Sequence, residues 1–442
     1  MRLKRLRQAI AHPISQNVFA LYWLQFATFM VPLITLPYVA RVLQPSAFGL
    51  VVFSQGFAFV LMVLIDWGFS FHGTREAAST REDPAELAQA VHNVRGAQLL
   101  LSAASLPIAL GALLVVPKLS EHPEFLILAW VAAVAGGLSP SWYFVGVERL
   151  RLISFIQLAF RFLGAGLTFA FVRGPDDAWI VMALFAASNV TAWIAADILM
   201  YREIKFRVPR LRPSLGAVRG STMLFISTVA VTLYTAFNVV LLGLFEPSAA
   251  VAHFGAAERI LRVSLQVLAP IGTAVYPRLA ALQAAHKHER ARELLAIAIA
   301  AVGAVGLVLA AALAALAPLI IRILFGSAFV AESVPLLRVL VLIIPIAIVS
   351  AIAGSWLVTL HMDRRVARIA LGAGAINVAL GCVLTPLFGP VGMAWSVVTA
   401  EASAAVGTLI AVARYDRDTL SHLLSRMRLG ARQLASSSQE AE

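Results

Sequence analysis

The stretch VFALYWLQFATFMVPLITLPYVA, residues 18–40, decides the fold of this 442-residue chain. It contains no charged residue, and it has the length of about 20 apolar residues that a helix needs to cross ~30 Å of hydrocarbon. It is too long for the core of a signal peptide and lacks a small-residue cleavage site. We therefore expect an uncleaved first membrane span that follows a short basic start.

Apolar stretches of similar length recur along the rest of the chain, separated by short connections. The sequence predicts an all-α integral membrane protein with about twelve transmembrane helices. The predicted spans are 18–40, 46–70, 94–116, 124–146, 153–173, 178–200, 221–244, 251–275, 293–318, 334–360, 366–388 and 391–413. No connection between them is long enough to hold a catalytic domain.

The composition agrees with this fold class, because 60% of the residues are hydrophobic and only 13% are charged. A soluble domain is typically about 25% charged. The net charge of +12 would suggest a nucleic-acid partner in a soluble protein. Here the positive charge follows the predicted topology, so we expect membrane lipid and no nucleic acid as a partner.

The loops differ strongly in positive charge. With both termini in the cytoplasm, the inner segments carry 25 of the 35 Lys and Arg residues and the outer loops carry 4. Short positive loops are disfavoured on the translocated side. The sequence therefore predicts both termini on the cytoplasmic face of the membrane.

The two halves of the chain repeat each other a little over 200 residues apart. Ser141-Trp142 recurs as Ser355-Trp356, and Pro45-Ser46-Ala47 recurs as Pro247-Ser248-Ala249. Duplicated helical halves are how many transporters build a central site between two moving lobes. We predict an N-terminal six-helix lobe at 1–200, a basic cytoplasmic linker at 201–220, a C-terminal six-helix lobe at 221–413 and an amphipathic cytoplasmic tail at 414–442.

Motifs of soluble enzymes are missing from the sequence. It contains no phosphate loop, no HExxH, no GxSxG and no strand-borne GxGxxG. Its single cysteine, Cys382, excludes an intrachain disulfide or a thiol metal site. We therefore expect no enzyme activity, no cofactor, no metal and no catalytic residue.

Charged residues inside the predicted spans are the candidate functional groups. An ionised side chain in a bilayer is costly and normally pairs or marks a substrate path. Arginines outnumber acids there, and a guanidinium binds phosphate bidentately, so a cavity lined by arginines suits an anionic substrate. The candidate substrate-binding residues are Arg41, Arg161, Arg259 and Arg262, and the candidates for ion coupling or gating are Asp66, Glu258 and Glu401.

Each candidate also has a plainer interpretation. Glu258 and Arg262, four residues apart, can neutralise each other on one helical face, which would leave Arg259 as the functional group. Arg41 can extend to the outer interface instead. Arg161 and Glu401 lie deeper, and either form a gate between the lobes or serve substrate and proton separately.

Polar amides complete the candidate site. The amides that suit contacts with sugar hydroxyls include Asn17, Gln25 and Asn238. Hydrogen bonding between helices is the default role of such residues in a membrane.

Several long segments resemble one family. The segments are NVFALYWLQFATFMVPLITLPYVARVLQPSAFGLVVF (17–53), PSWYFVGVERLRLISFIQLAFRFLGAGLTFAFV (140–172), LFGSAFVAESVPLLRVL (324–340) and INVALGCVLTPLFGPVGMAWSVVTAEASA (376–404). In this order and spacing they resemble the Wzx-type flippases of O-antigen and other polysaccharides, which belong to the MATE-like MOP superfamily. The similarity runs over nearly all of residues 15–415.

The resemblance implies two six-helix bundles around a cavity with alternating access. It implies that undecaprenyl-pyrophosphate carrying an oligosaccharide moves from the cytoplasmic to the periplasmic leaflet, with proton coupling in some members. Arg41, Arg259 and Arg262 match places where the related lipid II flippases carry cavity arginines. Those relatives have two more spans than this chain can hold, which favours the O-antigen branch.

The resemblance also makes a polysaccharide polymerase and a chain-length regulator plausible partners. Three other functions stay open at this point: a MATE-like multidrug or metabolite antiporter, a lipid II flippase and a membrane polysaccharide polymerase. The surplus of arginine argues against a carrier of cationic drugs. The short outer loops argue against a polymerase.

Overall fold

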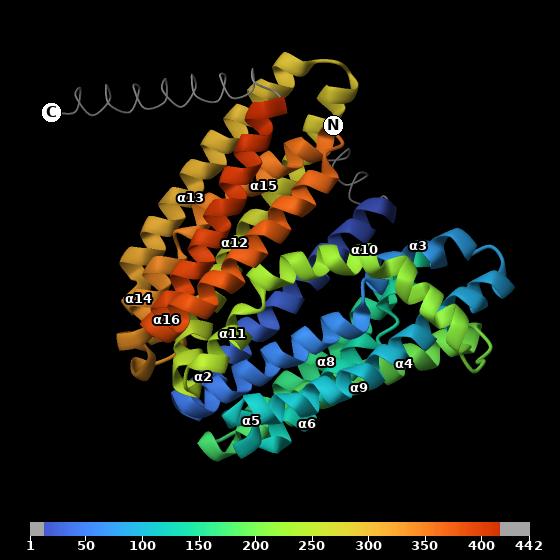
Figure 1. Ribbon diagram of the computed structural model, residues 1–442, viewed down its shortest axis with the longest axis horizontal. Coiled ribbons are helices and arrows are strands. Elements are labelled where there is room, and N and C mark those ends of the chain that lie inside the picture. Colours follow the sequence, from blue (N-terminus) through green and yellow to red (C-terminus); the bar gives the residue numbers. More distant parts are fainter. Residues whose placement is uncertain (1–12, 416–442) are drawn as a thin grey trace, which may run out of the picture. The chain divides into compact units, whose positions relative to one another are not determined.

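A computed structural model describes residues 13–415 of the chain, and every regular element in that range is a helix (Figure 1). Side chains are described from Val31 onward, apart from some positions inside five of the helices. The helices of the first half are α2 (Pro13–Asp66), α3 (Phe69–Thr80), α4 (Pro84–Val115), α5 (Pro117–Glu121), α6 (Pro123–Gly137), α7 (Ser141–Gly146), α8 (Leu150–Phe171), the short η1 (Pro175–Asp177) and α9 (Ala178–Glu203).

The second half has the same all-helical construction. Its helices are α10 (Leu211–Thr235), α11 (Asn238–Phe245), α12 (Ser248–Ala284), α13 (His288–Leu324), the short η2 (Ser327–Phe329), α14 (Val330–Leu340), α15 (Ile343–Thr359) and α16 (Asp363–Tyr415). The predicted tail lies almost entirely outside the described residues.

Eight helical segments within the described residues are long and apolar enough to cross a membrane. This confirms the predicted all-α membrane class. Two elements are about twice the length of a single crossing: α2 has 54 residues and α16 has 53. The count of twelve crossings and the position of the termini stay predictions.

Each of these two long helices is interrupted once by a residue with left-handed backbone. Gln44 has a φ of 61° in α2, and Gly389 has a φ of 61° in α16. Each is followed by proline, Pro45 or Pro390, which lacks an N–H and restricts the residue before it. The interruptions fall between predicted spans, where the chain has to reverse direction.

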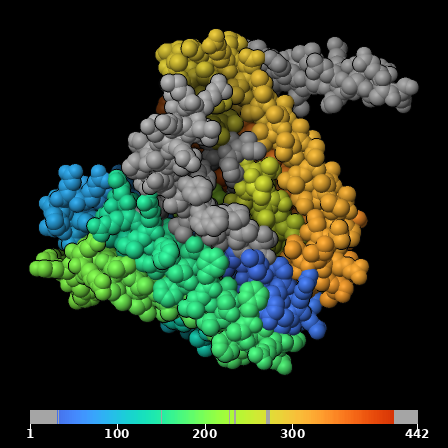
Figure 2. All heavy atoms as spheres, turned by 180° about the vertical axis from the view of Figure 1, so that it is seen from behind, coloured from blue at the N-terminus to red at the C-terminus, as the bar shows by residue number. Residues whose placement is uncertain are grey.

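Large apolar side chains are exposed along many of the long helices. Figure 2 shows the α13 segment, in orange, at the surface, and Leu307, Val308 and Ile323 of this helix are 57–70% exposed. Exposed apolar area on this scale marks contact with lipid or a partner. On a helix long enough to span the bilayer, it indicates the side that faces lipid.

The described chain forms two compact units. Unit 1 contains residues up to Val229 together with Pro247–Ala252, and unit 2 contains Ala230–Glu246 and the residues from His253 onward. These limits differ from the predicted lobe boundaries, which stay a prediction.

Part of the predicted linker is built into unit 1. α9 ends at Glu203 and α10 begins at Leu211, so only 204–210 is outside a helix. The buried His92 of α4 accepts a hydrogen bond from the backbone N–H of Arg207 at 2.8 Å. A side chain at Gly96 would lie 2.1 Å from the Ser214 hydroxyl. The linker is thus held against α4.

The repeated Pro-Ser-Ala turns also meet within unit 1. A Cβ at Gly49 in α2 would lie 1.7 Å from the carbonyl oxygen of Ser248, at the start of α12. No side chain fits in that space, so glycine is required for the close approach. The turns that the sequence repeat identifies therefore pack directly on each other.

Candidate functional site

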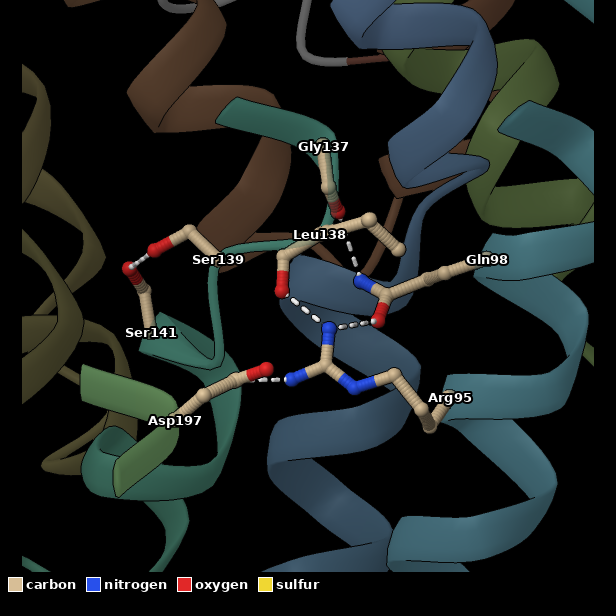
Figure 3. Close-up of polar contacts among 7 residues, drawn as sticks. All are labelled: Arg95, Gln98, Gly137, Leu138, Ser139, Ser141 and Asp197. Carbon is tan, nitrogen blue, oxygen red and sulfur yellow. Dashed lines mark hydrogen bonds and ion pairs between the residues drawn. The ribbon is translucent and has the colours of Figure 1, made fainter. Parts of the chain in front are cut away.

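A polar network in unit 1 surrounds the end of α6 (Figure 3). The predicted span 124–146 is interrupted here, because α6 ends at Gly137 and α7 begins only at Ser141, after Pro140. The carbonyl groups at the end of a helix lack partners in the helix. Gln98 of α4 donates to the Gly137 carbonyl at 2.8 Å, and Arg95 donates to the Leu138 carbonyl.

Arg95 also ties α4 to α9. Its guanidinium forms an ion pair with Asp197, and the Arg95 side chain is only 5% exposed (Figure 3). A charge buried in an apolar environment is tolerated only when it is paired and hydrogen-bonded. The ion pair and the hydrogen bond to the Leu138 carbonyl lie inside one unit, so we interpret Arg95 as a structural residue.

The sequence analysis did not single out this network. Arg95 lies at the start of the predicted span 94–116, and Asp197 lies near the end of the predicted span 178–200. The available signal was one arginine in the third predicted span and one acid in the sixth. Only the packing of α6 against α9 shows that they meet.

A second chain of polar contacts leads from the same break to α8. The hydroxyls of Ser139 and Ser141 are 3.0 Å apart, and Gln157 donates to Ser141 at 2.9 Å. Arg161 follows Gln157 by one helical turn. It lies within about 60° around the helix from the buried Gly164 and Thr168. Yet the Arg161 side chain is exposed, and no described residue forms a hydrogen bond or ion pair with it.

Two further candidates of unit 1 lie in α2, Arg41 just after the first predicted span and Asp66 near the end of the second. Arg41, three residues before the break at Gln44, is exposed and has no described hydrogen bond or ion pair. Asp66 ends α2 and accepts a hydrogen bond from the Ser70 hydroxyl at 2.8 Å. No described hydrogen bond joins any two of Arg41, Asp66 and Arg161.

In unit 2, four polar side chains form a chain across three helices. Asn377 of α16 donates to Asn238 of α11 at 2.7 Å, and Asn238 donates to Glu258 of α12 at 3.4 Å. Glu258 accepts from Arg262 at 2.7 Å. Both asparagines are at most 1% exposed. Helix α11 approaches α16 closely where Gly381 faces Leu241.

The sequence left two interpretations of Glu258 open, namely pairing with Arg262 or a role in ion coupling or gating. Glu258 and Arg262 pair on one helical face, as one of the alternatives predicted. Asn238 serves as a bridge between helices, so its contact with sugar stays a prediction. The Arg262 side chain remains 37% exposed, against 10% for Glu258, which leaves part of the guanidinium accessible to a ligand.

The ion pair between Glu258 and Arg262 does not include Arg259, which lies between them in α12. Arg259 follows Glu258 directly and therefore points about 100° away around α12. It is partly buried, and no described residue forms a hydrogen bond or ion pair with it. A partly buried guanidinium without a carboxylate partner is well suited to bind an anion.

Glu401 lies in the part of α16 that follows the interruption at Gly389. Its side chain is partly buried, and no described residue donates a hydrogen bond to it. Asn17 and Gln25 lie in α2, but their side chains are outside the described residues. The structure thus brings together Glu258, Arg262 and Asn238, and the roles of all ten candidates in binding and coupling stay predictions.

The sequence patterns of two known families match this chain. The sequence pattern described as "Polysaccharide biosynthesis protein" matches residues 14–283, more than half of the chain. The chain belongs to the polysaccharide biosynthesis protein family. The MatE pattern also matches, over residues 224–383, so the resemblance to the MATE-like MOP superfamily is confirmed.

Two curated relatives carry the same name. A "Putative O-antigen transporter" of Escherichia coli (strain K12) is 25% identical over 393 residues, which cover 88% of this chain and 94% of that protein. A protein of that name from Shigella dysenteriae is 29% identical over 275 residues, which cover 61% of this chain and 68% of the relative. Both are named as transporters.

Solved structures of the superfamily share the fold. Lipid II flippase MurJ in an inward closed conformation aligns with a TM-score of 0.65 and 15% identity, covering 94% of this chain and 93% of MurJ. An inward-facing multidrug resistance MATE transporter aligns with a TM-score of 0.63 and 14% identity, covering 92% of this chain and 95% of that protein. At this identity the likeness shows a shared fold.

Proposed function

We propose that this chain is a flippase for lipid-linked oligosaccharides. It moves undecaprenyl-pyrophosphate carrying an oligosaccharide repeat unit from the cytoplasmic to the periplasmic leaflet of the bacterial inner membrane. The product feeds the synthesis of a surface polysaccharide such as O-antigen, capsule or exopolysaccharide. The observation that carries the proposal is membership of the polysaccharide biosynthesis family over residues 14–283.

The intramembrane arginines agree with this substrate. Arg259 has no described carboxylate partner, and Arg262 is only partly covered by Glu258. A pyrophosphate carries negative charges that guanidinium groups bind with short, charge-assisted hydrogen bonds. Arg41 and Arg161 supply further positive charge in unit 1. Asp66, Glu258 and Glu401 are the groups that we propose for ion coupling or gating.

The chain performs transport and no bond-breaking chemistry in this proposal. Alternating access of two helical units exposes one site to each leaflet in turn. A polysaccharide polymerase and a chain-length regulator act on the product and are the proposed protein partners. Net transport is driven by consumption of the product or by a proton gradient.

The deciding experiment is deletion of the gene in its native host, followed by extraction of the lipid-linked intermediates. We expect undecaprenyl-pyrophosphate repeat units to accumulate in the cytoplasmic leaflet and the surface polysaccharide to disappear. Complementation with the wild-type gene should restore both. Repeat units that reach the periplasmic leaflet but stay unpolymerised would contradict flipping and favour a polymerase.

A second candidate function is a MATE-like multidrug antiporter, favoured by the MatE match over residues 224–383. It predicts that the deletion strain becomes sensitive to cationic drugs while its surface polysaccharide stays normal. A lipid II flippase would instead be essential for cell-wall synthesis. Growth, drug sensitivity and surface glycan in one deletion strain separate these outcomes.

A further inference from the structure

Unit 2 contains a cavity of about 330 Å³ that the site described above does not use. This volume is at the small end of the range for ligand pockets, about 300–1,000 Å³. The cavity is lined by residues near the end of α12, by one face of α15 and by parts of α16 on both sides of its interruption at Gly389. Its lining residues include Tyr276, Ser350, Gly354, Ser355, Ala370 and Thr408.

The walls of this cavity favour an apolar occupant. Most of the lining is aliphatic, and two of its hydroxyl groups are engaged by their own helices. Ser355 donates to the Ala351 carbonyl at 2.9 Å, and Thr408 donates to the Ala404 carbonyl at 2.7 Å. Hydroxyls that bond back to the carbonyl four residues earlier need no partner from a ligand.

The cavity lies next to the turn between α15 and α16. Val358 and Val366 belong to its lining, and this turn is the segment between them. The turn carries Arg364 and Arg365, and the predicted topology places it at the cytoplasmic surface. The cavity therefore lies at the depth of the inner-leaflet acyl chains closest to the headgroups.

Positively charged residues lie close in sequence to this end of the cavity. Arg278, Arg365 and Arg368 each lie within two residues of a lining residue. An apolar cavity with cationic neighbours at headgroup depth matches an amphiphile that has an anionic head and a hydrocarbon chain. Among such molecules, the substrate of the proposed flippase starts its path in this leaflet.

We infer that the unit 2 cavity holds the isoprene units next to the pyrophosphate of the polyprenyl carrier before translocation. The inference rests on the proposed function and adds to it a binding place for the lipid chain, apart from the arginines that bind the head. Holding the chain here restricts the substrate to one orientation. It also lets the protein recognise the carrier lipid independently of the sugar.

Two glycines give a matched test of the cavity. A Cβ at Gly354, in the cavity wall, meets no atom within 4 Å, and the same is true of Gly303 in α13, outside the cavity lining. Gly354→Leu should therefore fill the cavity without a backbone clash. Gly303→Leu makes the same chemical change elsewhere in unit 2. Ala370→Phe fills the cavity from α16 and serves as the second filling variant should Gly354→Leu fail to fold.

The experiment uses the full chain in proteoliposomes with an undecaprenyl-pyrophosphate disaccharide that carries a diazirine on the isoprene units next to the head. After illumination, we expect cross-linked peptides from α15 and α16 in the wild type. Cross-linking should fall at least fivefold in Gly354→Leu or Ala370→Phe and stay unchanged in Gly303→Leu. Excess undecaprenyl phosphate should compete with the probe, and phosphatidylglycerol should compete much less.

Three outcomes would overturn the inference. The first is equal cross-linking in the wild type and a folded cavity-filling variant. The second is equal competition by phosphatidylglycerol, which would make the cavity a general phospholipid site. The third is translocation of the probe by wild-type vesicles with labelling only elsewhere, which would leave the proposed function intact. Absence of both translocation and labelling would overturn the proposed function as well.

Discussion

Arg259 and Arg262 lie three residues apart in α12, but their surroundings give them different roles. Arg262 is bound to Glu258, which in turn bonds to Asn238. No described residue forms a hydrogen bond or ion pair with Arg259. A single substitution at each position therefore separates a group needed for structure from a group free to bind substrate.

We expect Arg259→Ala to impair transport without loss of stability. A hydrogen bond to a charged group contributes about 1.5–3 kcal/mol, so transport should fall about tenfold or more. Surface polysaccharide measured per amount of folded protein in the complemented deletion strain reports this loss. Arg322→Ala, at an exposed arginine near the end of α13, is the control and should export normally.

Arg262→Ala should instead lower the stability of the protein. The substitution leaves Glu258, which is largely buried, without its cation, and an uncompensated buried charge is destabilising. The melting temperature of the purified protein in detergent measures this effect. A variant that melts like the wild type would show that Glu258 does not need Arg262.

The ion pair between Arg95 and Asp197 makes a sharper test of the unit 1 network. Asp197→Leu leaves the buried guanidinium of Arg95 unpaired and should cost about 3–5 kcal/mol. The double variant Arg95→Leu with Asp197→Leu removes both charges and should be clearly more stable than Asp197→Leu alone. Thermal unfolding of the wild type, both single variants and the double variant compares them. An additive loss in the double variant would contradict the coupling.

At the residue scale, the sequence alone pointed to the candidate charged residues but did not identify the distant residues that contact one another. Intramembrane charge alone pointed to Arg259 and to the pairing of Glu258 with Arg262, because four residues on a helix bring two side chains to one face. The contact of Asn238 with Asn377 joins positions 139 residues apart. No local spacing can show such a contact, since it depends on how α11 packs against α16.

Among the elements, the breaks between helices carry the most information. The break after α6 coincides with Pro140, and the groups that cap it come from α4. The sequence predicted one continuous span here because no charged residue occurs between Glu124 and Glu148. The breaks inside α2 and α16 fall between predicted spans. In each break the polar Gln44 or Gly389 directly precedes a proline, which disfavours helical backbone at that residue.

The attachment of the linker to α4 can be tested with another pair of glycines. Gly96→Val should force Ser214 and Pro209 away from α4, because a Cβ at Gly96 would lie 2.1 and 2.6 Å from their side chains. Gly216→Val is the control, since a Cβ at Gly216 meets nothing within 4 Å.

The measurement is limited trypsin digestion of the detergent-solubilised protein. Cleavage after Arg207 or Arg210 should be several times faster in Gly96→Val than in the wild type and unchanged in Gly216→Val. Equal digestion of all three proteins would show that the linker does not depend on this contact.

For the molecule as a whole, the predicted topology is the property that most needs measurement. The single cysteine makes this direct, because Cys382→Ser gives a cysteine-free background. We expect cysteines at exposed positions Ser79 and Ala285 to react only from the cytoplasmic side. Cysteines at the exposed Ser120 and Ser327 should react only from the outside. A reversed pattern at any position would require a different number of crossings.

The membrane class, the family and the repetition of the two halves could all be predicted from the sequence, because hydropathy, loop charge and repeated motifs are local or periodic signals. The limits of the two compact units could not. Pro247–Ala252 belongs to unit 1 although its neighbours on both sides belong to unit 2. That assignment depends on the close approach of Gly49 to Ser248, which no property of either segment alone reveals.

The polar chain from Asn377 through Asn238 and Glu258 to Arg262 has a consequence for evolution. Each member satisfies its neighbour, so replacing one by an apolar residue leaves a buried group unsatisfied. A lineage can abandon the arrangement only by changing several members within a short interval. These four positions should therefore vary as a set among descendants of a common ancestor, while Arg259, one residue away from Glu258, drifts with the chemistry of the cargo.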